Sequence, residues 1–431
     1  MNPESTLTET NLGALRDVPY MGVIFVVAEA MKLGFVNGHP DWCNLGQGQP
    51  EVGAMEGAPP RILAVELDPA DCAYGPLEGT PELRERIAEY ANRLYRKDSD
   101  SQYTAANVGV AAGGRLALTR AMAALGTVRV GYQVPDYTAY EDMFNLHLDR
   151  IEPIALQGRR EHGFVVGADQ LREASQRHGL DAYVFSNPCN PTGNVIAGEE
   201  LAQVARLARE RGLTIISDEF YSHFIYEPHE PHGNGECVPA AGPVSMARYV
   251  EDVDRDPILV FDGLTKGHRY PGWRVGWVLG PPAMVESMAR TASSIDGGPS
   301  RIAQRAAMQA LEPARADQET TALRTVFCQK RNLMVRRLKS MGIEFVTEPM
   351  GTFYCWASLA NLPAPFDDAM TFFRRALGHK VLTVPGAFFD INPGKRRTEP
   401  SPYDQWMRFS FGPPMDNMVM GLDRLEAMLR A

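Results

Sequence analysis

The chain of 431 residues carries 43 Lys and Arg against 53 Asp and Glu, which gives a formal net charge of −10. This balance argues against nucleic acid and against an anionic membrane surface as partners, because both attract clustered basic side chains. A single core rarely grows beyond roughly 250–300 residues, so we expect one large domain and a smaller one.

The start of the chain is expected to be loop-rich, without a targeting or membrane segment. No charged stretch leads into an apolar core, so no signal peptide is predicted. The longest early apolar run, residues 21–28, is far shorter than the roughly 20 residues that a membrane helix needs. The six cysteines form no Cys-x-x-Cys pair, so we expect neither a disulfide framework nor a zinc ribbon, and a cytoplasmic location.

From residue 107 onward, short β-like runs alternate with amphipathic helices. Helices are predicted over residues 115–125 and 199–211, the second one ended by Gly212. The predicted strands are short apolar runs that cover residues 107–112, 128–133, 181–186, 213–217, 258–262 and 275–279. This alternation favours an α/β domain with a largely parallel sheet, in which ligands bind at the carboxyl ends of the strands.

The C-terminal part follows another pattern, in which long helices lead to strand-like runs and a terminal helix. These runs cover residues 352–356, 380–384 and 406–411. We predict a large domain over residues 61–309 and a small domain formed by both chain ends, residues 1–60 and 310–431. Residues 227–256, rich in Pro, Gly, His and Glu, are predicted to form a long surface loop with one helical turn.

The segment LTKGHRYPGWRVGW, residues 264–277, carries the strongest chemical signal. Lys266 follows a predicted buried strand, and Arg274 comes eight residues later. A lysine amine forms an imine with an aldehyde cofactor if neighbours or burial lower its pKa, and a planar guanidinium can grip a phosphate. Taken alone, the segment is equally consistent with a solvated lysine and a structural arginine.

Two further segments place polar groups at strand ends. Asn190, in NPCNPTGN, follows one predicted strand and is well placed to donate to a ligand oxygen, although a plain turn explains the same residues. Asp218, in SDEFY, follows another. A buried carboxylate is costly unless it is paired, and a protonated ring nitrogen is one possible partner. The alternative is that Asp218 caps a helix.

Together these segments closely resemble the class I/II aminotransferases of pyridoxal 5′-phosphate (PLP) fold type I, the aspartate aminotransferase superfamily. The resemblance extends from about Leu45 to Phe411, and Asn190, Asp218 and Lys266 match motif positions of the family, as Arg274 does. It implies an α/β fold: a large domain with a mostly parallel central sheet flanked by helices, plus a smaller α+β domain. The interval from Asp218 to Lys266 is long for the family, and the extra residues coincide with the loop 227–256.

The resemblance also implies roles. Lys266 resembles the lysine that holds the cofactor as a Schiff base and moves the substrate proton. Asp218 resembles the partner of the pyridinium nitrogen, which keeps the ring an electron acceptor. Asn190 and Tyr221 resemble the donors to the phenolic oxygen of the ring, and Tyr137 resembles the aromatic residue stacked on its face.

The phosphate of the cofactor is expected at residues 112–115, AGGR, where a strand ends and a helix opens. Gly113 and Gly114 allow close backbone approach, Arg115 follows them, and a helix N-terminus favours an anion, although a tight turn has the same sequence. Thr265 and Arg274 would complete this cradle.

Other contacts are expected from more distant parts of the chain. Tyr74 resembles the tyrosine that reaches the phosphate of the neighbouring subunit, which implies a homodimer with composite sites. Arg408, in MRFSFG, is expected to bind the substrate carboxylate together with Asn190, and the alternative is an edge-strand surface arginine. Gly48, in NLGQGQP, resembles the loop glycine near that carboxylate.

The side-chain pocket is expected at residues 291–300, TASSIDGGPS, where relatives specific for acidic substrates carry an arginine. This stretch has none, so we predict weak activity with aspartate. Asp296 would favour a donor with a cationic or polar side chain. The alternative is that Asp296 caps a helix beginning near Pro299.

No metal site is predicted, because His223, His229, His232 and Cys237 fit no strong zinc spacing. The expected function is ping-pong transamination between an amino acid and a 2-oxo acid. The alternative is a PLP-dependent lyase, replacement enzyme or cyclase that acts on an amino acid side chain through the same intermediate. A regulator that uses this domain as a sensor would need a DNA-binding domain, for which residues 1–45 leave no room.

Overall fold

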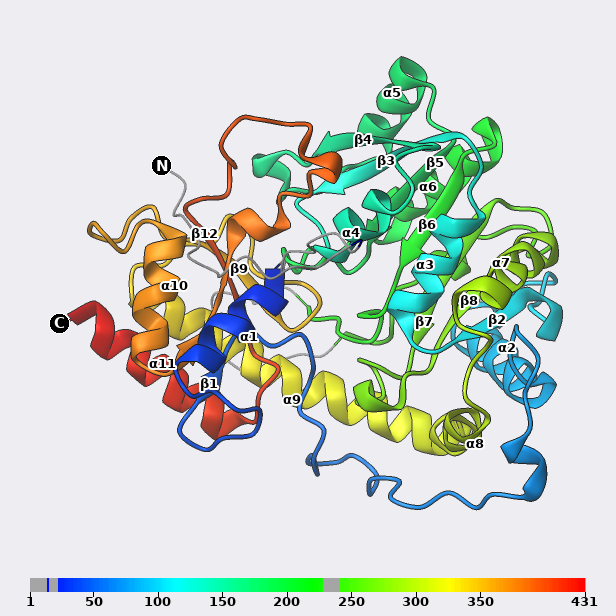
Figure 1. Cartoon of the computed structure of the whole chain (residues 1–431), viewed down its shortest axis with the longest axis horizontal. Helices are drawn as coiled ribbons and strands as arrows, with labels where there is room; N and C mark the ends of the chain where they lie inside the picture. The colour runs from blue at the N-terminus through cyan, green and yellow to red at the C-terminus, as the bar shows by residue number, and fades with distance from the viewer. Residues whose placement is uncertain (1–13, 15–21, 228–239, 431) are drawn as a thin grey trace.

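A seven-stranded sheet forms the centre of the computed structural model, which describes residue 14 and residues 22–227 and 240–430 (Figure 1). Its strand order is β2-β8-β7-β6-β5-β3-β4; β8 runs antiparallel to both neighbours, and the other pairs are parallel. The strands are β2 (Val108–Ala111), β3 (Val128–Val134), β4 (Ile151–Gln157), β5 (Ala182–Ser186), β6 (Thr214–Asp218), β7 (Ile258–Gly263) and β8 (Gly276–Leu279).

The central strands are apolar because helices cover both faces of the sheet. Every residue of β5 and β7 is buried, as is typical of parallel strands enclosed on two sides. Helices α3 (Gly114–Ala124) and α7 (Pro282–Ile295) pack together on one face, and α5 (Ala168–His178) and α6 (Gly198–Arg211) pack on the other. Helix α2 (Pro81–Tyr95) packs on β2 and on α8 (Arg301–Ala310), and α4 (Ala139–Asn145) follows β3.

A second, smaller group of strands lies beside the first and draws on both ends of the chain. Strands β11 (Val384–Pro385), β12 (Trp406–Ser410) and β9 (Tyr354–Ser358) form an antiparallel sheet in that order. Strand β1 (Cys43–Asn44) pairs in parallel with β10 (Val381–Leu382). Around them lie α1 (Gly22–Lys32), α10 (Ala369–Gly378) and α11 (Met415–Arg430).

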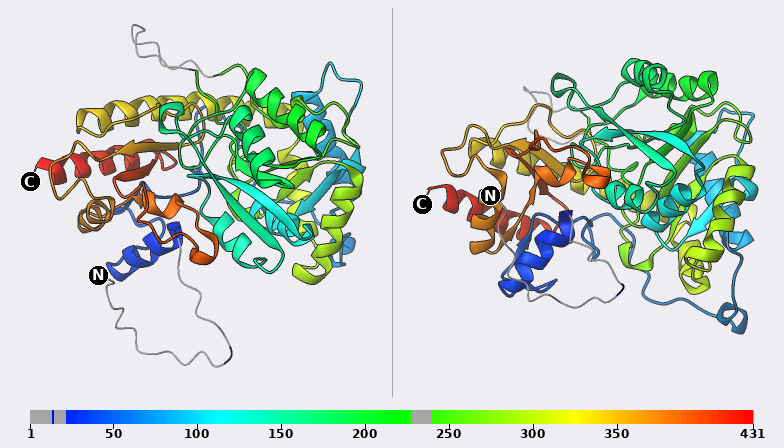
Figure 2. Two further views of the ribbon diagram at one scale, coloured as in Figure 1. Left: turned by 90° about the horizontal axis from the view of Figure 1, so that it is seen from above. Right: turned by 45° about the horizontal axis from the view of Figure 1, so that its top comes forward.

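The long helix α9 (Pro313–Ser340) joins the two groups. It begins next to α8 and runs along the molecule to α11 and β9 (Figure 2). Residues 51–80 follow the same lower edge of Figure 1 as an extended segment, interrupted by the short helix η1 (Pro69–Cys72). This arrangement agrees with the expected contribution of both chain ends, while the boundaries at residues 60 and 310 stay a prediction.

The predicted strands and helices of the central sheet are present within two residues of their expected bounds, and Gly212 ends α6 in the left-handed conformation. The prediction missed β4, and the run 380–384 is divided between β10 and β11. Within the described part of the loop 227–256, one short helix, η4 (Met246–Arg248), forms.

Two other expectations concern cysteines and membranes. The sequence predicted no disulfide framework; in the structure Cys328 is disulfide-bonded, while Cys43, Cys72, Cys189 and Cys355 are free. Among the helices of the described residues, none combines the length and the apolar character that crossing a bilayer requires.

Candidate active site

A cavity of about 690 Å³ opens where β5, β6 and β7 end, between the large sheet and the small one. Most of the predicted site residues line it: Gly48, Gly114, Arg115, Tyr137, Asn190, Asp218, Tyr221, Thr265, Lys266, Arg274 and Arg408. Gly113 lies directly beside this lining. Tyr74 and Asp296 do not line the cavity of their own chain.

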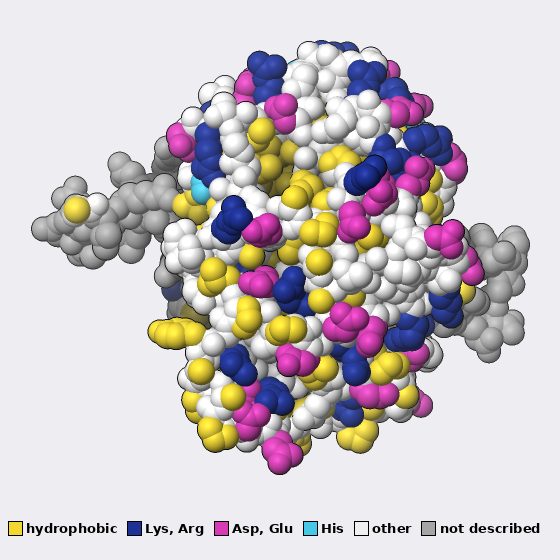
Figure 3. Space-filling model, turned by 90° about the vertical axis from the view of Figure 1, so that its right-hand side faces the viewer, with side chains coloured by type: hydrophobic (Ala, Val, Ile, Leu, Met, Phe, Trp, Pro, Cys, Tyr) yellow, Lys and Arg dark blue, Asp and Glu magenta, His cyan; other side chains and the backbone are white. Residues whose placement is uncertain are grey.

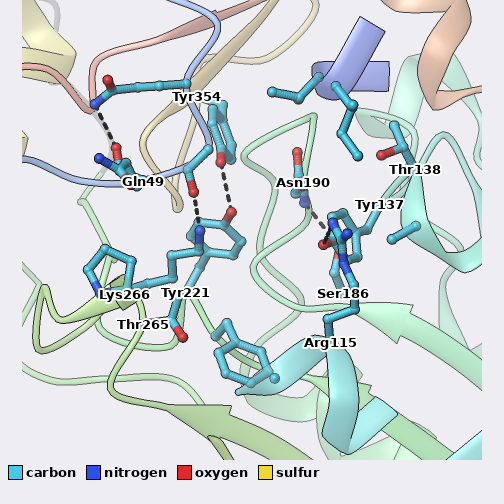
Figure 4. Close-up of a pocket in the computed structure, with 18 of the residues that line it drawn as sticks. Gln49, Arg115, Tyr137, Thr138, Ser186, Asn190, Tyr221, Thr265, Lys266 and Tyr354 are labelled. Atoms are coloured by element: carbon cyan, nitrogen blue, oxygen red, sulfur yellow. Dashed lines mark hydrogen bonds between the residues drawn. The ribbon is translucent and has the colours of Figure 1, made fainter. Parts of the chain in front are cut away.

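Lys266 lines the cavity beside Tyr221, on the turn that follows β7 (Figure 4). Its Nζ donates a hydrogen bond to the carbonyl oxygen of Gly48. Burial lowers the pKa of Lys266 to about 7, and the nearby guanidinium groups of Arg408 and Arg274 act in the same direction. A substantial fraction of this amine is therefore neutral, and nucleophilic, at neutral pH.

Asp218 is the last residue of β6. It is buried and lines the same cavity as Lys266. The hydroxyl of Tyr140 donates to its Oδ2 over 2.9 Å. Burial raises the pKa of Asp218 to about 6, while the Tyr140 hydrogen bond and the positive charge of Lys266 oppose this shift. Tyr140 lies on the first turn of α4, and no sequence motif pointed to it.

Two tyrosine hydroxyls meet on the same side of the cavity as Lys266 (Figure 4). The hydroxyl oxygens of Tyr221 and Tyr354 lie 2.8 Å apart. The Lys266 Nζ lies 5.6 Å from the centre of the Tyr221 ring. Tyr354 comes from β9, far along the chain, and no sequence motif pointed to it.

Arg408 is buried in β12, the middle strand of the small sheet, so the alternative of an edge-strand surface arginine is wrong. Its Nη1 donates to Oδ1 of Asn190 over 2.8 Å, and its Nη2 donates to the carbonyl of Gly46 over 2.9 Å. The guanidinium lies 4.0 Å from the centre of the Tyr354 ring. Because the Asn190 oxygen accepts from Arg408, its amide nitrogen is left as the donor toward the cavity.

Near the start of α3 the cavity is lined by groups that can bind an anion. Gly113, with a φ of 94°, precedes the first residue of α3, and a Cβ there would collide with the guanidinium of Arg274. The hydroxyl of Thr265 is buried and has no hydrogen-bond partner among the described residues. Arg115 donates from Nη2 to the hydroxyl of Tyr137 over 3.0 Å. An unsatisfied hydroxyl, two guanidinium groups and a helix N-terminus fit the phosphate of PLP.

Asp296 is held outside this cavity. Its carboxylate forms a nearly buried ion pair with Arg120, with Oδ1 2.8 Å from Nη2. It follows the end of α7, whereas Ser300 caps the start of α8 through the amide of Ala303. The alternative that Asp296 caps that helix is therefore wrong, and the helix begins at Arg301.

The histidines form no metal site in the described part of the chain. His223 Nε2 lies 2.7 Å from the hydroxyl of Tyr90, inside the protein. Groups of three or more potential ligands are absent from the described ranges. His229, His232 and Cys237 lie outside those residues.

The cavity, with its buried lysine and its arginines, lies in a protein that shares its fold with aspartate aminotransferases. A sequence profile of the family "Aminotransferase class I and II" matches residues 40–425, and the chain belongs to that family. Its activity is that of an aminotransferase, a PLP-dependent transferase that acts on an amino acid and a 2-oxo acid.

Curated relatives and solved structures agree with this family. The chain is 28% identical over 396 residues to an aspartate aminotransferase of Streptomyces avermitilis, covering 89% of this chain and 88% of the relative. It is 29% identical over 398 residues to a probable N-acetyl-LL-diaminopimelate aminotransferase of Bacillus subtilis, covering 90% and 89%. The aspartate aminotransferase of Thermus thermophilus with maleate shares the fold, with a TM-score of 0.75 and 24% identity over 96% of this chain and 100% of that chain.

Proposed function

We propose that the cavity binds PLP between Lys266 and Arg115 and that the amino acid substrate enters beside Arg408. The observation that carries this proposal is the position of Lys266. Its amine, with a lowered pKa, faces one cavity together with a buried carboxylate and a buried guanidinium.

The net charge of the cavity supports the proposal. Arg115, Arg274, Arg408 and Lys266 are its basic groups, and its acids are the buried Asp218 and the exposed Asp142, so four basic groups face two acids. Such a cavity favours anions, and the cofactor phosphate and the substrate carboxylate are two anions. Their sites lie at opposite ends, with Lys266 between them.

Each proposed residue has a defined task. When bound, PLP supplies an electron sink for the α-carbon of an amino acid. Asp218 holds a proton on the pyridine nitrogen, and Tyr140 orients the carboxylate by donating to it. Lys266, as a neutral amine, would serve as the base that accepts the substrate α-proton and, once protonated, as the acid that gives it back. Arg408 fixes the direction of the substrate by binding its carboxylate.

The remaining residues position the cofactor. Asn190 and Tyr221 donate to the phenolic oxygen of the ring, and Tyr137 covers the ring face and excludes water. Arg115, Thr265, Arg274 and the first amides of α3 hold the phosphate.

We also propose a homodimer in the cytoplasm, without nucleic acid or membrane partners. Tyr74 is fully exposed on the extended segment and does not reach the cavity of its own chain, which supports a role in a partner's site. On the face that Figure 3 shows, Lys and Arg side chains are interspersed with Asp and Glu rather than gathered in one basic patch.

A single-turnover experiment with a set of amino acids tests the proposed reaction. We expect a good donor to convert the bound cofactor stoichiometrically to pyridoxamine phosphate and to release its 2-oxo acid. Release of ammonia or of a side-chain fragment, without formation of pyridoxamine phosphate, would contradict it and indicate elimination or replacement chemistry.

A further inference from the structure

Asp136 is a completely buried carboxylate that does not line the cavity, yet it contacts two of the loops that form the cavity walls. It follows β3, one residue before Tyr137. Its Oδ1 accepts the backbone amide of Tyr137 over 2.7 Å, and its Oδ2 accepts the backbone amide of Ser186 over 3.0 Å. The hydroxyl of Ser186 also donates to Oδ1.

The Ser186 hydroxyl continues this network toward the proposed substrate site. It accepts the backbone amide of Asn190 over 3.0 Å. The side-chain oxygen of Asn190 in turn accepts from Nη1 of Arg408 over 2.8 Å. Figure 4 shows Ser186 and Asn190 on one wall of the cavity. Four residues from three separate parts of the chain are therefore linked by consecutive hydrogen bonds.

A second contact leads from Asp136 to the same guanidinium. The backbone amide of Asp136 donates to the carbonyl of Phe389 over 3.3 Å, and the centre of the Phe389 ring lies 5.0 Å from the guanidinium carbon of Arg408. Asp136 is thus linked to the Arg408 guanidinium by two routes, one through Ser186 and Asn190 and one through the backbone of Phe389, whose ring packs on that guanidinium.

The atoms around Asp136 require an acceptor. Ser186 offers a hydroxyl and an amide, and Tyr137 offers an amide, all of which donate. Burial raises the pKa of Asp136 to about 8, and the hydrogen bonds from Ser186 and Tyr137 act against this shift. When ionised, the carboxylate can accept all of these donors, while an amide in its place would turn one NH₂ group against them. Burying a carboxylate costs stability, so its retention here indicates a purpose other than a favourable free energy of folding.

We propose that Asp136 is a positioning residue for the substrate carboxylate and acts on Arg408 through Ser186 and Asn190. This inference rests on the proposed role of Arg408. Loss of the network would weaken the hold of Asn190 on Nη1 of Arg408 and leave the Gly46 carbonyl as its other hydrogen-bond acceptor. The amino acid and the 2-oxo acid would then both bind less well, because they share the carboxylate.

Ser186→Ala isolates the link between Asp136 and Asn190, since it removes the hydroxyl and keeps the backbone amide. We expect KM to rise roughly tenfold for donor and acceptor alike, with kcat changed less than about threefold and the dissociation constant of the cofactor unchanged. Asp136→Asn should raise both KM values in the same way. Ser186→Thr keeps the hydroxyl and should restore both KM values to within about twofold of the wild type.

Asp262→Asn is a matched control. Asp262 is another buried aspartate at a strand end, and it accepts from the hydroxyl of Ser222 over 3.0 Å and from the amide of Gly263 over 2.7 Å, outside the cavity lining. It should lower thermal stability without changing KM. Unchanged KM values in Ser186→Ala, or equal KM changes in Asp262→Asn, would overturn the positioning role.

Arg408→Leu separates this inference from the proposed function. If that variant alone leaves the KM of both substrates unchanged, the assignment of Arg408 is wrong and the inference falls with it. If Arg408→Leu raises both values, adding Ser186→Ala should change them no further, because no guanidinium remains to be positioned. Additive effects would show that Ser186 acts by another route.

Discussion

The negative charge of the buried Asp218 carboxylate lowers the free energy of unfolding. Burial raises its pKa to about 6, well above the value of about 3.9 for an exposed aspartate, although Tyr140 donates a hydrogen bond to it. A raised pKa stabilises the fold fully only below about pH 4, and this contribution is lost as the pH rises through about 6. Because ionised Asp218 is buried, we expect it to pair with a cationic group in the working enzyme.

Asp218→Asn should therefore separate stability from activity. In the cofactor-free protein we expect the variant to be more stable than the wild type above pH 6, and the difference to disappear near pH 4, as measured by urea unfolding at each pH. Single-turnover rates with an amino donor should fall by roughly 10²–10⁴ because the ring nitrogen loses its proton partner. Near-normal rates would mean that another residue protonates the ring.

At the scale of single residues, the sequence predicted those residues of the candidate site that belong to a recognisable motif. Lys266 and Asn190 follow apolar strands and Asp218 ends one, each within a recognisable segment, and Arg408 lies in β12. Tyr140 and Tyr354 were not predicted, because their importance comes from hydrogen bonds that span 78 and 133 residues of sequence. The spacing of Tyr140, three residues after Tyr137 in a helix, was a signal that it faces the same interior.

At the scale of elements, the start of α3 requires a residue without a side chain at position 113, and the sequence alone does not show this requirement. Gly113 has a φ of 94°, and any side chain there would meet the guanidinium of Arg274. Gly113→Ala should displace Arg274 from the proposed phosphate site, so we expect the dissociation constant of PLP to rise at least tenfold in a fluorescence titration.

Gly212→Ala is the matched control for this element. Gly212 also has a positive φ, 63°, at the end of α6, but no atom lies within 4 Å of an added Cβ. It should cost about 1 kcal/mol of stability and leave PLP affinity unchanged. Equal effects of the two substitutions on PLP affinity would argue against a phosphate site at α3.

Asp296 lies in the segment between α7 and α8, and its ion pair leads to another prediction. The Asp296 carboxylate is paired with the buried Arg120, so we expect Asp296→Asn to lower the free energy of unfolding by about 1–3 kcal/mol and to leave the ranking of amino donors unchanged. Comparing kcat/KM for arginine, lysine, glutamine, alanine and aspartate tests this. A changed ranking would mean that Asp296 contributes to a partner's substrate pocket.

Element prediction succeeded where burial on both faces gave continuous apolar runs, as in β5, β6 and β7. It missed β4, whose sequence IEPIALQ contains Pro153 and buries only Ile151 and Leu156. Strand β4 lies at the edge of the sheet, where a proline is tolerated because one side of the strand pairs with nothing.

At the scale of the whole molecule, the account depends on a second copy of the chain. Leu63 and Tyr74 are almost wholly exposed on the extended segment 51–80, and an unpartnered segment of this kind is typical of an interface. We predict a homodimer of about 95 kDa, twice the 47.6 kDa of one chain, in sedimentation experiments.

Mixed dimers test whether the sites are composite. Tyr74→Ala and Lys266→Ala homodimers should each be impaired, while a hybrid of the two variants regains one site with both native residues. We expect activity to return on mixing after reversible dissociation. No recovery in dimers shown to be hybrid would place Tyr74 outside the partner's site.

The identity of the lysine that holds the cofactor is the central claim, and one measurement addresses it directly. Borohydride reduction of the holoenzyme, followed by peptide mass spectrometry, fixes the cofactor to the lysine that carries it. We predict a phosphopyridoxyl group on the peptide that contains Lys266, and no labelled peptide in Lys266→Ala. A label on any other lysine of the wild-type protein would contradict the account.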